Sequence, residues 1–202
     1  MTTNHQHYKD PSPEEQSDFA LRLYFGAGNP RELVVHRAYL DLRRTVHGIK
    51  NYRDAQRKAH AYLKSVITAL PGNKAITGQK SFDTWHEKTC DKLCKIFDES
   101  GYKSFHIGQA QKWINMALKY LYVFGETRAP GYSKFYRYCH VPVDNIILES
   151  QAFKDLRSFR EAWSRIPEYS KYIAFQIAVR KRYHDSSPLA VEFWVWQGKI
   201  AT

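Results

Sequence analysis

Residues 109–124, QAQKWINMALKYLYVF, form the clearest helical pattern in the chain and decide the expected fold. The apolar residues recur three or four positions apart and form one stripe: Ala110, Ile114, Ala117, Leu118, Leu121 and Phe124. Lys112, Asn115 and Lys119 fall on another face of the same helix. The pattern therefore predicts a core helix that displays Lys112 near its start.

Similar periodicity predicts helices on both sides of this stretch. The expected ranges are 13–24, 31–47, 52–70, 81–99, 158–165, 168–183 and 187–196. Ser12-Pro13 and Ser187-Pro188 are typical helix starts, because a capping serine precedes a first-turn proline. Residues 125–140 contain Ala129-Pro130-Gly131 and are interpreted as an insertion between two core helices. Because most of the chain has helical spacing, we expect an all-α fold.

Length and charge narrow the class of protein. The 202 residues fit one compact domain, or two small lobes that share a core. The chain has 31 Lys+Arg against 20 Asp+Glu, a formal net charge of +11. Such a surface attracts polyanions, and nucleic acid is the expected partner. No apolar run approaches the roughly 18 residues that a membrane span needs, so we expect no membrane partner.

The N-terminal region and the cysteines bear on compartment. Residues 1–16 are polar and include Pro11 and Pro13, with no apolar centre of the kind a signal peptide requires. We expect residues 1–12 to be a disordered arm and the protein to be a cytoplasmic, nucleoid-associated monomer. Three cysteines are too few and odd in number for a disulfide framework, so reduced thiols are expected.

A second pattern concerns metal binding. His86, Cys90 and Cys94 recur every four positions, and Cys139-His140 follow later. This set could hold zinc, but thiols on helices are more often small core residues. An iron–sulfur cluster would need four suitably spaced cysteines. We therefore expect neither a metal nor a cofactor.

Asp144 closes the sequence Val141-Pro142-Val143-Asp144. Pro142 disfavours helix at Val141, so Asp144 is predicted to cap a helix that begins at Asn145. A lysine in a first turn and an aspartate at a cap are each ordinary surface features. Their occurrence in this order and context suggests an amine nucleophile, Lys112, with a carboxylate partner, Asp144.

On these residues the chain resembles the helix-hairpin-helix DNA glycosylases, which place a catalytic Lys at the head of a helix and a catalytic Asp at a later cap. The usual Leu-Pro-Gly-Val-Gly hairpin is reduced here to Ile107-Gly108. The archaeal 8-oxoguanine branch is the more similar one, because its altered hairpin and long Lys-to-Asp separation also occur here. Gln111-Lys112, Ala117 and Lys119 match its catalytic helix. Ser187-Pro188-Leu189, Glu192 and Trp196 match its base-pocket segment, with Glu in place of Asp.

The resemblance implies a two-lobed, helix-hairpin-helix bundle with its active cleft between the lobes. Residues 105–144 would supply the hairpin-like turn, the catalytic helix and the insertion, and residues 187–197 the base pocket. The substrate would be double-stranded DNA with a modified base, flipped out and held by Glu192 and Trp196. Lys112 would attack C1′, a route that also allows β-lyase chemistry, while Asp144 accepts its proton or stabilises the sugar cation.

The identity of the base and of the phosphate contacts is less constrained. The base is 8-oxoguanine by resemblance, or a virus-type modified cytosine such as glucosylated hydroxymethylcytosine, which leaves repair and antiviral defence both open. The predicted DNA-binding residues are Gly108, Gln109, Gln111, Lys119, Arg180, Lys181 and Arg182, with Arg43-Arg44 and Arg57-Lys58 as further basic clusters.

Three alternatives remain on sequence grounds. Trp194 and Trp196 could cover the core while Glu192 lies in solvent. The chain could be a basic DNA-binding protein without catalysis. It could also be a helical interaction protein whose charge serves solubility.

Overall fold

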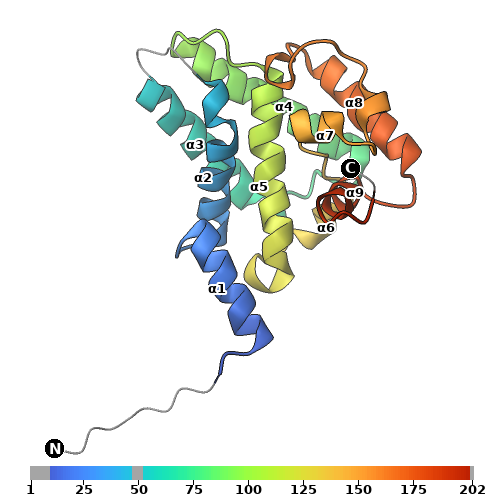
Figure 1. Ribbon diagram of the computed structural model, residues 1–202. Helices are drawn as coiled ribbons and strands as arrows, with labels where there is room; N and C mark the ends of the chain where they lie inside the picture. The colour runs from blue at the N-terminus through green and yellow to red at the C-terminus, as the bar shows by residue number, and fades with distance from the viewer. Residues whose placement is uncertain (1–9, 47–51, 201–202) are drawn as a thin grey trace, which may run out of the picture.

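The computed structural model describes residues 10–46 and 52–200, and every regular element within these ranges is a helix (Figure 1). The long helix α5 (Ile107–Arg128) runs through the centre of the molecule. Both α2 (Pro30–Leu42) and α4 (Gln79–Glu99) pack directly against it, and α3 (Tyr52–Ala69) packs against those two. The prediction of an all-α fold is confirmed for the described residues.

The remaining elements are shorter. They are α1 (Pro13–Phe25), α6 (Ser133–Tyr136), α7 (Asn145–Glu149), α8 (Tyr169–Arg182), α9 (Pro188–Trp196) and the 3₁₀ turns η1 (Arg43–Thr45), η2 (Leu70–Gly72), η3 (Lys154–Leu156) and η4 (Trp163–Arg165). Figure 1 shows α2 and α3 on one side of α5 and α6 to α9 on the other. None of the helices in the described ranges has an apolar stretch long enough to cross a bilayer.

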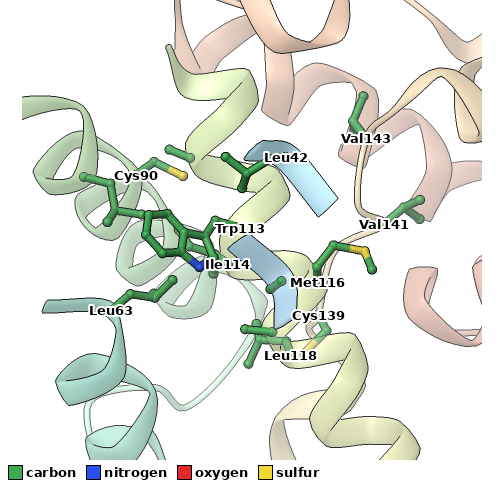
Figure 2. Packing of buried hydrophobic residues seen from close by; sticks show 14 of the residues in the cluster. Leu42, Leu63, Cys90, Trp113, Ile114, Met116, Leu118, Cys139, Val141 and Val143 are labelled. Atoms are coloured by element: carbon green, nitrogen blue, oxygen red, sulfur yellow. The ribbon is translucent and has the colours of Figure 1, made fainter. Parts of the chain in front are cut away.

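The core is built around Trp113 of α5. Its ring is fully buried, packs 4.8 Å from the ring of Tyr39, and donates an indole hydrogen bond to the Val35 carbonyl at 2.9 Å. Figure 2 places Leu63 and Val143 on opposite sides of α5, and both belong to the same buried cluster. The predicted apolar stripe of α5 is buried as expected. The opposite face is also largely covered, so α5 is enclosed on all sides near its start.

The predicted helix over 158–165 is wrong, since only η4 forms there. The guanidinium of Arg157 donates to the carbonyls of Phe159, Arg160 and Glu161 at 2.8, 3.2 and 2.8 Å, which a helix would need for its own hydrogen bonds. The helix predicted over 31–47 ends at Leu42, and residue 47 lies outside the described ranges. Of the predicted N-terminal arm, residues 1–9 also lie outside them.

Helix α1 is attached differently from the others, because none of its residues is buried. Its last residue, Phe25, packs its ring 5.0 Å from that of Tyr120 and 4.8 Å from that of Phe124. An ion pair joins Asp18 to Arg128. The helix is therefore fixed to α5 mainly through its C-terminal end.

Candidate active site

The Val141–Val143 segment is an extended stretch buried in the interior, and two glutamine side chains hold it there. The amide of Gln176 on α8 accepts from the Val141 N–H at 3.0 Å and donates to the Val141 carbonyl at 2.8 Å. The amide of Gln111 on α5 accepts from the Val143 N–H at 3.1 Å and donates to its carbonyl at 2.8 Å. Because an unpaired buried backbone group is costly, these amides replace the partners that a strand would supply. Pro142, between them, has no N–H to satisfy.

The side-chain hydrogen bonds of Gln111 and Gln176 to this segment form a clamp. It brings Lys112 and Asp144 together, because Lys112 follows Gln111 and Asp144 follows Val143. Asp144 caps α7, as predicted, with its Oδ1 accepting from the Ile147 N–H at 3.0 Å. Its Oδ2 accepts a hydrogen bond from Lys112 Nζ. The two side chains are only 7% and 16% exposed. An amine and a carboxylate thus form a largely buried ion pair with one carboxylate oxygen fixed by the backbone.

The pair borders a cavity of about 630 Å³ that opens to solvent. The lining residues come from both sides of α5: Tyr24, Leu40, Asp41, Arg44, Lys112, Met116, Lys119, Tyr120, Val123, Asp144, Asn145, Ile146, Trp163, Phe193, Trp196 and Gln197. Four of the lining residues are large hydrophobic side chains exposed to solvent: Tyr24, Val123, Ile146 and Trp196. The cavity therefore combines an apolar rim with charged groups along α5.

Lys119 follows Lys112 on α5 and also lines the cavity. Its ammonium pairs with Glu192 of α9 and lies 4.7 Å from the centre of the Trp196 ring. Glu192 is 1% exposed, and no group in the described ranges hydrogen-bonds its Oε2. Burial raises the pKa of Glu192, and the charge of Lys119 opposes that rise.

This arrangement changes two assignments made from the sequence. Glu192 does not line the cavity but lies behind Lys119, so it is not placed to touch a base directly. Lys119, predicted to contact a phosphate, lines the cavity and pairs with Glu192. Trp196 is 53% exposed and does line it, as a stacking residue must.

A second wall comes from α1 and α2, which carry no recognisable motif. The Tyr120 hydroxyl donates to Asp41 Oδ2 at 2.6 Å and lies 3.2 Å from the Tyr24 hydroxyl. Burial raises the pKa of Tyr120, and its hydrogen bond with Asp41 acts in the same direction. Arg37 donates to the Tyr24 hydroxyl at 2.8 Å. Among the residues of this wall, only Arg44 had a signal in the sequence, as part of a basic cluster.

Three residues predicted to contact DNA at the start of α5 serve the fold. Gly108 is buried, and its N–H donates to the Ile166 carbonyl at 3.2 Å. The Gln109 amide donates to the Thr45 carbonyl at 2.9 Å and accepts from the His106 N–H at 2.8 Å. Gln111 is occupied by the clamp. These groups are already hydrogen-bonded inside the protein, so they are not available to a phosphate.

The basic clusters are also partly neutralised by neighbouring carboxylates. Arg180 forms an ion pair with Asp83 at 3.0 Å, and Arg182 pairs with Asp155 at 2.5 Å. Lys181 is exposed. Arg57 and Lys58 both pair with Asp54, at 2.7 Å each. None of the residues 180–182 lines the cavity.

The His86–Cys90 region, considered above for zinc, lies in a hydrogen-bonded interior. Both ring nitrogens of His86 are used, Nδ1 with the Tyr169 hydroxyl and Nε2 with Asn115 Oδ1, each at 3.0 Å. Burial lowers the pKa of His86 and raises that of Cys90. Within residues 10–46 and 52–200, no three His, Cys, Asp or Glu side chains lie close enough to hold a metal.

Chemically, the site offers an amine in contact with a carboxylate, a second amine further along the same helix, and aromatic rings at the opening. Such a set can perform nucleophilic attack and stabilise developing charge. The chain matches no family model, no curated protein and no solved structure in the comparisons made.

Proposed function

We propose that the chain is a DNA glycosylase that excises a modified base and can form a covalent Schiff base through Lys112. The observation that carries this proposal is the Lys112–Asp144 ion pair, which borders an open cavity rather than lying in a closed core. Burying two charges costs several kcal/mol per ion, so a buried pair is weak evidence of a purely stabilising role. A pair that a ligand can reach is better explained by reaction with that ligand.

In the proposed mechanism Asp144 accepts a proton from Lys112. The freed amine attacks C1′ of the flipped nucleotide, and the C1′–N bond breaks with its electron pair leaving on the base. The C1′–O4′ bond then breaks, O4′ takes up the proton lost from Nζ, and a Schiff base forms between C1′ and Lys112 Nζ. Loss of a proton at C2′ expels the 3′-phosphate as the C3′–O bond breaks, so the strand is cut by β-elimination. No metal takes part in these steps.

The cavity supports a base as the ligand. Its volume of about 630 Å³ lies within the range of roughly 300–1,000 Å³ that small-molecule sites occupy. Trp163 and Trp196 offer rings for stacking, and the volume leaves room for a base with a bulky substituent. The proposed substrate is 8-oxoguanine, which the resemblance suggests, or a cytosine modified as in viral DNA, within double-stranded DNA.

The arrangement of helices and the charge fit the same proposal. Residues from α1 and α2 line one side of the cavity and residues from the 145–197 region line the other, which accords with a two-lobed glycosylase bundle. The net charge of +11 favours DNA, and Arg44 lies exposed at the cavity, where it can meet a phosphate.

Borohydride trapping tests the proposal directly. The purified chain is incubated with duplexes that carry 8-oxoguanine, an abasic site or glucosylated hydroxymethylcytosine, alongside Lys112→Gln and the matched surface variant Lys92→Gln. We expect an adduct with the wild-type chain and with Lys92→Gln, and none with Lys112→Gln. Base release without an adduct would make water the nucleophile. Neither adduct nor free base on any duplex would refute the glycosylase and favour a binding protein.

A further inference from the structure

Lys112 and Lys119 are two amines on one helix that face the same cavity. They are about two turns apart, which places their Cα atoms roughly 10 Å from each other along the helix axis. A nucleotide that presents C1′ to Lys112 therefore has its base available to extend toward Lys119. Lys119 is therefore placed to contact the base, which is the leaving group of the reaction.

The surroundings of Lys119 fix its ammonium without using all of its hydrogen-bonding capacity. Glu192 pairs with it from behind, and the Trp196 ring flanks it. An ammonium has three N–H donors, so a ligand in the cavity can still accept from it. Glu192 Oε2 is buried without a hydrogen-bond partner in the described ranges, a costly state for a carboxylate.

We propose that Lys119 stabilises the negative charge that develops on the departing base, and that the excised base presents a carbonyl oxygen or a similar acceptor to it. The inference rests on the proposed glycosylase function. As the C1′–N bond breaks, its electron pair moves onto the base and is delocalised to the exocyclic oxygen, where the ammonium lies. No proton need be transferred, because the charge-assisted hydrogen bond lowers the energy of the anion. Glu192 is then a positioning residue that aims Lys119.

This role predicts a split between two reactions of the same enzyme. Base excision has a leaving base, whereas trapping at a preformed abasic site has none. We expect Lys119→Gln to slow single-turnover base release by about 10²–10³-fold, the usual effect of losing one donor to a developing anion. The same variant should trap at an abasic site within about threefold of the wild-type rate, while Lys112→Gln loses both reactions. Lys92→Gln, on the outer face of α4, should change neither.

The removal of Lys119 leaves Glu192 unpaired, so folding is checked with Lys119→Gln/Glu192→Gln, which deletes both charges. The double variant should show the same split, and its loss of base release should be smaller for bases that are better leaving groups. Equal loss of both reactions in the folded double variant would make Lys119 a structural residue and overturn the assignment. Base release that does not depend on Lys119 would overturn it as well, with the glycosylase intact. A wild-type chain inactive on both duplexes would overturn the glycosylase and this role together.

Discussion

Replacing Gly108 by alanine should push away the backbone segment 163–166, whose Trp163 side chain lines the cavity. A Cβ built on Gly108 would lie 1.7 Å from the carbonyl oxygen of Trp163 and 2.8 Å from its carbonyl carbon. Carbon and oxygen in contact are normally about 3.3 Å or more apart, so the backbone of 163–166 would have to retreat by roughly 1.5 Å. That movement would also break the hydrogen bond from the Gly108 N–H to Ile166.

The expected loss of stability follows from these two effects. Overpacking a well-packed site costs about 1–3 kcal/mol, and the lost hydrogen bond adds about 0.5–1.5 kcal/mol. The sum is about 1.5–4.5 kcal/mol. For a chain of this length, each kcal/mol lowers the melting temperature by roughly 2–4 °C, so Gly108→Ala should melt about 3–18 °C below the wild type.

Thermal unfolding followed by circular dichroism measures this difference. Gly72→Ala is the matched control, since a Cβ there meets nothing within 4 Å and the change should stay within about 0.5 kcal/mol. If Gly108 instead serves as a phosphate contact, both variants should melt together and only DNA binding should weaken. Equal melting temperatures for the two alanine variants would refute the packing argument.

Three further predictions concern the helix cap at Asp144, the buried His86 and the proposed DNA contact of Arg44. Asp144→Asn keeps a capping side chain and Asp144→Ala does not, so in urea unfolding the alanine variant should be about 1 kcal/mol less stable; equal midpoints would show that the cap contributes nothing. Burial lowers the pKa of His86 below the 6.5 of an exposed histidine, so the unfolded chain binds the additional proton and the free energy of unfolding should fall as pH drops below about 6.5. His86→Gln should flatten this part of the pH dependence; an unchanged slope counts against it. Arg44→Gln should reduce the salt slope of DNA affinity by about one, as measured by fluorescence anisotropy, and an unaltered slope would remove Arg44 from the interface.

The helical core was predictable because its signals are local. The stripe of α5 and the cap at Asp144 depend on residues within a few positions of one another, and both are confirmed. The prediction of a helix over 158–165 was wrong for a reason that the spacing of apolar residues does not report. The Arg157 side chain binds backbone carbonyls that a helix would need, and that competition depends on its three-dimensional path.

The polar face of α5 shows where the sequence pattern misleads. Asn115 looks like a solvent-facing residue, yet its amide donates to Gln111 at 3.0 Å and to the Tyr172 hydroxyl at 2.8 Å. Buried polar side chains can satisfy one another, and one partner here, Tyr172, is distant from Asn115 in the sequence. Tyr24 and Asp41 escaped prediction for the same reason, because nothing near them in the chain signals that they meet at Tyr120.

The two sides of the cavity differ in how freely mutation can alter them. Lys112 and Asp144 adjoin segments locked by buried amides, so most changes around Gln111 or Val143 would threaten folding itself. Tyr24 comes from α1, which buries none of its residues and therefore tolerates change at little thermodynamic cost. Under selection, one wall can diversify while the other stays constant. The range of ligands that the proposed enzyme accepts can thus change without loss of the proposed reaction.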